Sequence, residues 1–565
     1  MYKKRGRAKD ENPAPPAKRL RQNIADLYLS NDISASRAQE LYEDAVAAGT
    51  AHVNDLARVG QGGRLFKNLA RDLKAKLLKG SRWPKPYMAK VRMWDPKRSE
   101  EVLSDMAFLL PHEIMWAMLE DGATQQFLLG QQKLPSTDAI HVSTVCDELG
   151  ADRMKTLGVA LWGDGIPFNY DRSASLDVFS LSLPGFEGTK FSTMRIPLFA
   201  MDHKHVIKGS TFDDLMAVLA WSFTHLATGI KPGARHDGTP FHPRSDRSRL
   251  PKEGPSYVGF HGILMECRGD WKQLKDVFRF PQFNEVAGMC WLCACTPATW
   301  RLTGPDAPWR NQRLTHWGFV ARLRSRGLSP SPLFATPGLR TQCFKPDWLH
   351  VCDLGVTSDF LGNFLLLVSQ KLPGASHKSR VEAMWKDIQA WYKRHGVENR
   401  LDNLCPSMLQ GSSTKPPKLR AKAAQARSLV PYAVYAADSF LAGSDVEAAA
   451  KAMANQLAAC YECLSPDKFD HGKLAHHCRR FCGLAVAMEE RHDGILWRCK
   501  PKIHLFQELA EFLVDCPSLF WTYRDEDFGG SMAQLARKRG GPATSGSISK
   551  NVLLRHCAKH KLPSV

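Results

Sequence analysis

Two cysteines near the middle of the chain have the spacing of metal ligands. Cys290 and Cys293 form a Cys-x-x-Cys turn, with Cys295 beside it, and such a turn presents two thiolates to one zinc ion. This is half of a zinc site, so further ligands must come from elsewhere in the chain. We expect His504 as the third ligand, and the fourth stays open among Glu508, His471, His476 and His477. Buried, reduced cysteines without a metal are the alternative.

Isolated acidic residues follow apolar segments at two places. Asp164 stands between two glycines after Leu161-Trp162, and Asp270 follows Arg268-Gly269 after an apolar run. Small neighbours would let a metal ion or a phosphate approach such carboxylates closely. Taken singly, a Gly-Asp-Gly sequence is more often an ordinary turn.

Two further acidic groups lie nearer the C-terminus. Asp347-Trp348-Leu349-His350 and the following Asp353 precede an apolar helix expected at 360–368, and their roles stay open. Asp525, Glu526 and Asp527 form an acid triplet behind an aromatic pair, Phe520-Trp521. Acid triplets are usually solvated surface, and the sequence alone leaves open which of the three would bind a metal.

Basic residues are dense in several stretches. Between Arg64 and Arg98 twelve cations face only Asp72 and Asp95, and Trp83, Tyr87 and Trp94 are interleaved. Cations at this density bind phosphates by releasing counterions, and aromatic rings offer stacking faces for bases. A solvated basic surface is the alternative reading. The expected nucleic-acid contacts are Lys74, Lys76, Lys79, Arg82, Arg322, Arg324, Lys418 and Arg420.

The composition is that of a globular protein with a polyanionic partner. The 565 residues are 44% hydrophobic and 24% charged, which excludes a mainly disordered or fibrous chain. The formal net charge of +20 favours a nucleic acid or an acidic membrane surface as partner. The longest apolar runs are about ten residues, against ~20 for a membrane span, so we expect no membrane segment.

The first 155 residues are expected to be basic and mostly helical. Residues 1–22 resemble a disordered basic arm whose two Lys/Arg clusters are typical of a nuclear import signal. Residues 23–155 are expected to form a helical, basic DNA-binding region. Ser36 and Gln39 suggest a capping box for a helix that stops at Gly49.

From residue 156 the pattern changes to mixed α/β. Strands are expected at 159–162, 178–183 and 196–201, a helix at 212–227 and a loop at 231–256. Residues 371–500 are expected to be a helical insertion, with 446–464 its clearest helix. The last residues, 541–565, are expected to be a flexible basic tail.

The order of these elements resembles the DDE transposases of the CACTA-like group, together with the Plavaka-type transposases and the V(D)J recombinase catalytic subunit. The resemblance covers residues 156–540. It implies an RNase H-like mixed-sheet catalytic core, in two parts (156–370 and 501–540), with Asp164, Asp270 and Glu526 as its catalytic acids. It also matches Cys290, Cys293 and His504 to a zinc element, and Asp347 and His350 to an Asp-x-x-His element. The tryptophan-rich helices and basic loops also resemble transposon-derived proteins of dinoflagellates.

The resemblance implies a nuclear enzyme that nicks and joins DNA. Three carboxylates would hold two Mg²⁺ (or Mn²⁺) ions for phosphoryl transfer, and Zn²⁺ would be structural, tying the insertion to the core. DNA would be the partner, bound by a homo-oligomer. The alternative is a catalytically inactive, transposase-derived, zinc-containing DNA-binding protein.

Overall fold

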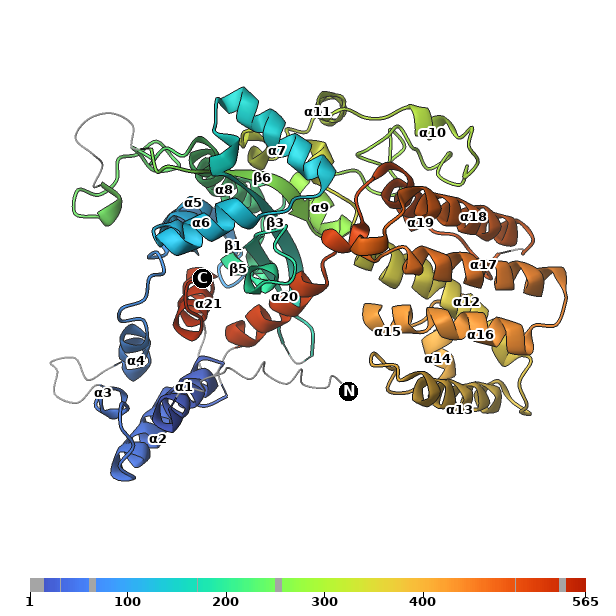
Figure 1. Ribbon diagram of the computed structural model, residues 1–565, viewed down its shortest axis with the longest axis horizontal. Helices are drawn as coiled ribbons and strands as arrows, with labels where there is room; N and C mark the ends of the chain where they lie inside the picture. The colour runs from blue at the N-terminus through green and yellow to red at the C-terminus, as the bar shows by residue number, and fades with distance from the viewer. Residues whose placement is uncertain are drawn as a thin grey trace. The chain divides into compact units, whose positions relative to one another are not determined.

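A computed structural model describes residues 15–30, 32–59, 68–169, 171–248, 257–492, 494–537 and 545–565 (Figure 1). Arg64, Lys67 and residues 1–14 of the expected basic arm lie outside this part of the chain. The fold is mixed α/β and mainly helical. Its chain forms two compact units. The sheet unit comprises Lys9–Arg279, Leu328–Cys343 and Arg524–Val565, and the helical unit comprises Phe280–Gly327 and Phe344–Tyr523.

A four-stranded mixed sheet forms the centre of the sheet unit. Its strands are β3 (Thr156–Pro167), β4 (Ser175–Ser182), β5 (Ile196–Asp202) and β6 (His261–Arg268), in the order β5-β4-β3-β6. The first three form an antiparallel meander, and β6 pairs with β3 in parallel. The three strands expected from the sequence are confirmed. These strands are almost wholly buried, as expected for a sheet covered on both faces.

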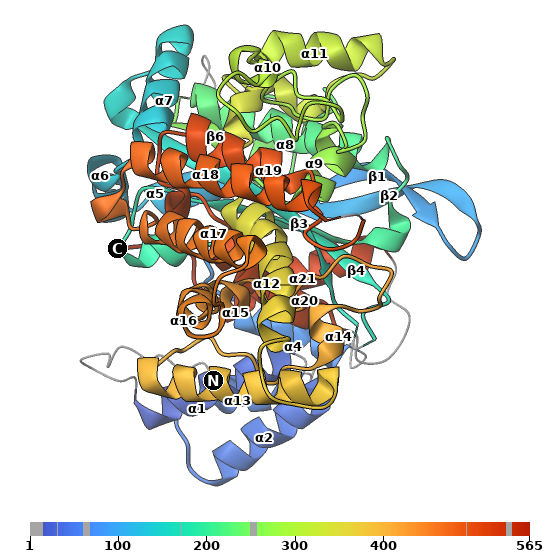
Figure 2. The ribbon, with the colours of Figure 1, turned by 90° about the vertical axis from the view of Figure 1, so that its right-hand side faces the viewer.

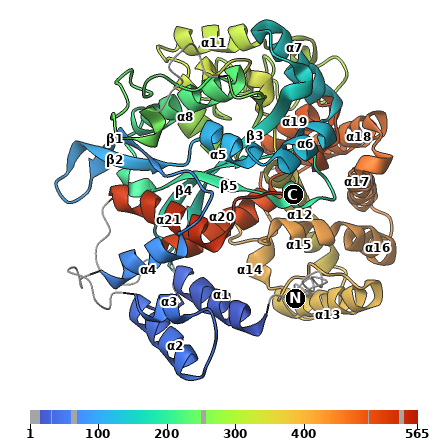
Figure 3. The ribbon, with the colours of Figure 1, turned by 60° about the vertical axis from the view of Figure 1, so that its left-hand side comes forward.

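Different helices cover the two faces of the sheet. On one face, α7 (Ser136–Leu149) and α8 (Thr211–Thr228) enclose a core that includes Val142, Ala227 and Ile263. On the other face, α20 (Tyr523–Ala536) and α21 (Ser545–Lys559) pack on β3, β4 and β5 (Figure 3). The last segment was expected to be a flexible tail. That expectation is wrong, because Val552 and Leu553 of α21 are buried.

The region 23–155 contains a hairpin that the sequence reading missed. Strands β1 (Tyr87–Asp95) and β2 (Glu100–Phe108) pair antiparallel in full register. Along β1 the buried Val91 and Met93 alternate with the exposed Lys90 and Arg92. This period of two is a strand signal, which the density of basic residues obscured.

The rest of this region is helical, as expected. Helices α1 (Pro16–Leu29), α2 (Ala35–Ala47), α3 (Asn54–Ala57) and α4 (Leu69–Leu77) enclose a small apolar core of their own. Helix α1 starts inside the segment expected to be a disordered arm. Ser34 caps α2 by accepting a hydrogen bond from the Arg37 amide, so the expected cap at Ser36 was two residues late. Two more helices follow, α5 (Pro111–Leu119) and α6 (Gly122–Gln131).

The helical unit contains the expected insertion and more. Its longer helices are α11 (His316–Ser325), α12 (Ser358–Ser369), α13 (His377–His395), α16 (Val430–Phe440), α17 (Asp445–Glu462) and α18 (His471–Glu490). Helices α17 and α18 pack side by side (Figure 2). The unit begins at Phe280 rather than at residue 371, so it includes the Cys-x-x-Cys turn.

Two π-helical segments interrupt this unit, η7 (Leu349–Thr357) before α12 and η9 (Glu508–Phe512) after α19 (Lys502–Gln507). The continuous stretch Leu349–Ser369 is long and apolar enough, by length and composition, to cross a membrane. Of its most apolar window, 78% is buried inside the structure. That burial is typical of a core helix.

Candidate metal centres

Four buried side chains of the helical unit converge on one point. The ligand atoms of Cys290, Cys293, His504 and Glu508 all lie within 4.8 Å of one another. The Cys293 Sγ is 3.4 Å from His504 Nε2, and His504 Nε2 is 3.5 Å from the Glu508 Oε1. The four residues can therefore bind a metal ion. The position left open from the sequence is filled by Glu508.

Local backbone geometry sets up both halves of this centre. In the turn, the Leu292 amide donates to the Cys290 Sγ at 3.3 Å, which favours the thiolate form. His504 is the third residue of α19, and Glu508 begins η9 four residues later, so both side chains lie on one helix face. The rings of Trp309 and His504 form a T-shaped contact with centroids 4.5 Å apart.

The electrostatics of the centre favour a divalent cation. Burial raises the pKa of the Cys290 thiol well above its ordinary value, so without a cation this sulfur stays protonated. Arg313 donates two hydrogen bonds to Glu508, at 2.9 and 2.7 Å. Two thiolates, Glu508 and Arg313 together carry two negative charges, which one divalent ion neutralises. Two sulfurs, an imidazole nitrogen and a carboxylate oxygen form a ligand set that zinc accepts.

Several sequence-based alternatives lie elsewhere. His471, His476 and His477 are on α18, outside the groups of metal-ligating atoms found among the described residues. The chain has a second Cys-x-x-Cys, formed by Cys460 and Cys463 at the end of α17, which the sequence analysis did not consider. It belongs to no such group in the described part of the chain. All four ligands of the centre lie in one unit, so a metal there joins two distant segments of the helical unit.

In the sheet unit, two of the expected catalytic acids meet. A carboxylate oxygen of Asp164, on the central strand β3, lies within 4.8 Å of one of Glu526, on α20. The two residues are 362 positions apart in the sequence. Both side chains are partly buried. The pair is therefore able to share a divalent cation.

A glycine lets α20 approach β3 this closely. A Cβ atom at Gly529 would lie 2.9 Å from side-chain atoms of Trp162 and Ile166. These two residues flank Asp164 on the same face of β3, because side chains alternate along a strand. Glu526 precedes Gly529 by three residues, so both face β3 from one side of the helix.

The neighbours of Glu526 have different environments. Asp525 is fully buried and forms ion pairs with Arg195 and with Arg268, the latter at 3.6 Å. Arg268 also pairs with Glu266. Asp527 is exposed. Of the acid triplet, Glu526 is thus the residue beside Asp164, while Asp525 belongs to a buried ion-pair network.

Asp270 lies at the end of the neighbouring strand but faces another partner. Trp162 of β3 pairs with Arg268 of β6, so Asp164 and Asp270 each follow that pair by two residues. The Asp270 carboxylate accepts the Gln273 amide at 2.6 Å and caps α9 (Trp271–Phe278). Among the described residues it is not grouped with Asp164 and Glu526. The structure therefore brings two of the three predicted acids together.

The Asp-x-x-His element is a hydrogen-bonded unit within the helical unit. Asp347 lies 2.7 Å from His350 Nδ1 and accepts the Thr522 hydroxyl at 2.8 Å. Hydrogen bonds from His350 and Thr522 outweigh the opposing effect of burial and lower the pKa of Asp347. Burial raises the pKa of Asp353 to about 7, although the hydroxyls of Tyr461 and Tyr523 donate to it.

The expected phosphate-binding residues differ in accessibility. Lys79, Arg82, Arg324 and Arg420 are exposed. Lys74 is held by the Asn551 side chain at 2.9 Å. Other partners occupy the remaining three residues: Lys76 lies 4.0 Å from Asp55, Arg322 donates to the Cys290 carbonyl and Lys418 donates to the Leu354 carbonyl. Arg322 thereby supports the Cys-x-x-Cys turn.

Comparison with known proteins adds no relative. No protein-family model matches the chain, and no curated protein matches its sequence.

Proposed function

We propose that the protein is a metal-dependent, DDE-type enzyme that nicks DNA and transfers its strands, as a transposase does. The observation that carries this proposal is the meeting of Asp164 and Glu526 beside the central strand of a mixed sheet. Two ionised carboxylates brought together from distant parts of a sequence repel each other, and a cation bound between them removes this repulsion. A site of this kind favours a hard, oxygen-loving ion such as Mg²⁺ or Mn²⁺.

The sheet supports the RNase H-like part of the proposal. Its first strand, β3, is central, with a hairpin partner on one side and the parallel strand β6 on the other. The resemblance puts the first catalytic acid on the first strand of such a core, and Asp164 lies on the first strand of this sheet. Asp164 leaves β3 near its C-terminal end, and Asp270 follows the adjacent end of β6. In parallel strands these ends lie at one edge of the sheet, so Asp164 and Asp270 follow neighbouring strands at the same edge.

Each acid has a distinct task in this proposal. Asp164 would hold the ions from the sheet, and Glu526 would hold them from α20. Asp270 would be the third ligand, in place of its present role as the cap of α9. Paired divalent ions would activate water, or later a DNA 3′-hydroxyl, and stabilise the departing oxygen of the phosphodiester. A nuclear location and a homo-oligomer on DNA belong to the same proposal.

The metal in the helical unit is proposed to be zinc with a structural role. Cys290, Cys293, His504 and Glu508 would hold it, and all four side chains are buried. Structural zinc sites are closed in this way, whereas catalytic ones keep a position open for water or substrate.

The test is nicking of supercoiled plasmid in Mg²⁺ or Mn²⁺. We expect Asp164→Asn and Glu526→Gln each to reduce the rate of nicking by about a hundredfold or more, because changing even a hydrogen-bonding neighbour of a metal ligand costs about 10–100-fold. DNA affinity should be unchanged or higher, since each change removes a negative charge. Asp527→Asn, on the same helix but exposed, is the matched control and should nick like the wild type. Equal rates in all four proteins would refute the proposal.

One observation favours the alternative, an inactive DNA-binding protein descended from such an enzyme. Asp270 is engaged as a helix cap and is not grouped with the other two acids in the described structure. Comparison of the wild type with Asp270→Asn separates the two cases. If the protein is an active enzyme, the wild type nicks DNA and Asp270→Asn does not. If it is an inactive binding protein, neither nicks DNA, and both bind DNA with an affinity that depends steeply on salt.

A further inference from the structure

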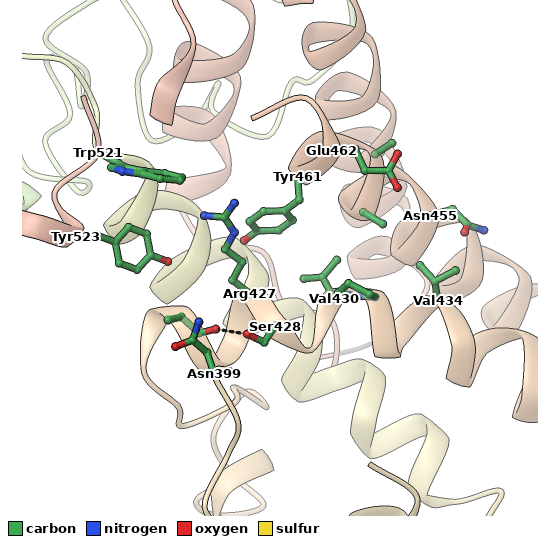
Figure 4. A pocket seen from close by; sticks show the side chains of 14 residues that line it. Asn399, Arg427, Ser428, Val430, Val434, Asn455, Tyr461, Glu462, Trp521 and Tyr523 are labelled. Carbon is green, nitrogen blue, oxygen red and sulfur yellow. Dashed lines mark hydrogen bonds between the residues drawn. The ribbon is translucent and has the colours of Figure 1, made fainter. Parts of the chain in front are cut away.

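A cavity of about 860 Å³ opens within the helical unit (Figure 4). Residues of α15 (Ala423–Ser428), α16 and α17 line it, together with Trp521 and Tyr523. Its lining combines apolar side chains, such as Val430 and Val434, with polar ones, such as Asn399, Arg427 and Asn455. This size and composition are those of a pocket for a small molecule.

An arginine with unused hydrogen-bonding capacity stands in the cavity. The Arg427 guanidinium lies 4.8 Å from the centre of the Trp521 ring and 5.5 Å from that of Tyr461. Within the described part of the chain, no carboxylate or carbonyl accepts a hydrogen bond from this guanidinium. A guanidinium carries five N–H donors in a planar fork that fits phosphate and carboxylate oxygens. The ring contacts hold the fork in place and leave its donors for an anion.

The rings around Arg427 are themselves fixed. The hydroxyls of Tyr461 and Tyr523 both donate to Asp353, which is fully buried. The Trp348 ring packs on Tyr461, with centroids 5.6 Å apart, and Trp521 packs on Tyr523 at 5.3 Å. An aromatic wall that is already in place loses little conformational entropy when a flat ligand stacks against it.

We propose that this cavity binds a nucleotide, with its phosphate on Arg427 and its base against Trp521. The indole offers a flat face for a base of any sequence. The amides of Asn399 and Asn455, which also line the cavity, add donors and acceptors for other polar groups of the ligand. The exposed Glu462 can accept hydrogen bonds from a sugar hydroxyl or an exocyclic amine.

Two ligands would present this phosphate and base to the cavity: a free nucleoside monophosphate, or one unpaired nucleotide of a DNA strand. Binding of the free nucleotide is independent of the proposed strand transfer. Binding of a strand nucleotide rests on that proposed function and extends it, because the cavity would then hold an unpaired base of the substrate.

The experiment measures fluorescence anisotropy of etheno-AMP and, separately, of a fluorescein-labelled single-stranded ten-nucleotide DNA, with the full-length protein at physiological salt. We expect AMP to displace etheno-AMP better than adenosine, ribose 5-phosphate or inorganic phosphate does. Arg427→Gln and Trp521→Leu should each weaken binding by about tenfold or more, the effect of losing a charge-assisted hydrogen bond or a stacking face. Two different variants, each checked by thermal melting, separate loss of the cavity from loss of folding.

The matched control is Arg394→Gln. Arg394 also lies over a tyrosine ring, 5.7 Å from the centre of Tyr435, but it does not line the cavity. Its variant should bind like the wild type. Dependence on Arg427 and Trp521 with etheno-AMP identifies a free nucleotide. The same dependence with the oligonucleotide alone identifies a strand nucleotide.

The proposal is overturned if neither Arg427→Gln nor Trp521→Leu weakens binding, or if the protein binds neither probe. Plasmid nicking by these variants distinguishes this failure from that of the proposed function. An enzyme that nicks but binds no nucleotide in the cavity refutes the present inference alone.

Discussion

At the scale of single residues, three adjacent acids show how strongly environment decides chemistry. Successive residues of a helix point about 100° apart, so neighbours face different surroundings. Asp525 faces two arginines in the protein interior, Glu526 faces Asp164 and Asp527 faces solvent. Three consecutive residues of the same charge thus have different roles: Asp525 forms structural ion pairs, Glu526 is a candidate metal ligand and Asp527 is exposed on the surface.

This difference predicts that Asp525 and Asp527 contribute unequally to stability. Asp525→Asn leaves Arg195 and Arg268 buried without their shared partner, so we expect the free energy of unfolding to fall by about 3–5 kcal/mol. Asp527→Asn should change it by less than about 0.5 kcal/mol. Urea denaturation followed by circular dichroism measures both. A wild-type midpoint for Asp525→Asn would show that the network contributes nothing.

The cysteine centre also yields a prediction at this scale. Replacing Cys293 with Ser removes one of four buried ligands, so we expect loss of the bound metal and a lower melting temperature. A chelator should lower the melting temperature of the wild type but not that of this variant. Cys405→Ser, at a partly exposed position outside the centre, should retain the metal. Elemental analysis of the purified proteins measures the content and identity of the metal, and an unchanged content in Cys293→Ser would contradict the assignment.

At the scale of elements, the position of Glu526 depends on how closely α20 packs on β3. Gly529 and its neighbour Gly530 differ in this respect. A Cβ atom at Gly529 meets Trp162 and Ile166, whereas nothing lies within 4 Å of one at Gly530.

The two glycines therefore predict a matched pair of variants. Gly529→Ala should push α20 away from β3, lower the melting temperature and reduce metal-dependent nicking. Gly530→Ala should keep nicking and raise stability by up to about 1 kcal/mol, because alanine favours a helix over glycine. Differential scanning fluorimetry and the plasmid assay measure both effects. Equal behaviour of the two variants would show that the close contact is not required.

At the scale of the whole molecule, the charge of +20 predicts DNA binding that weakens steeply with salt. Individual cations contribute only where phosphate can reach them. Arg324 is exposed, whereas Lys74 is bonded to Asn551, and burial lowers the pKa of Lys74 to about 8.

Arg324→Ala should therefore reduce the slope of log affinity against log salt concentration by about 1, the value for one phosphate contact. Lys74→Ala should leave that slope unchanged. Filter binding of a DNA duplex at several salt concentrations measures both. An equal loss of slope in the two variants would show that burial in the free protein does not limit contact with DNA.

The sequence by itself determined three of the four strands of the sheet, the helical insertion and the two cysteines of the cysteine centre. These features rest on local signals, namely apolar periodicity and the spacing of Cys290 and Cys293. The hairpin of β1 and β2 also had a local signal, in alternating side chains, but the basic composition of the segment concealed it. The helix α21 was missed because its burial depends on strands hundreds of residues away.

Only the tertiary structure decided which distant groups meet. It selected Glu508 from four candidate ligands and Glu526 from three adjacent acids, and it placed Asp270 on a helix cap. It also revealed the cavity around Arg427, whose walls come from separate segments of the helical unit. Such choices depend on packing over long sequence separations, because a side chain's orientation follows from the element it packs against and not from its neighbours in the chain.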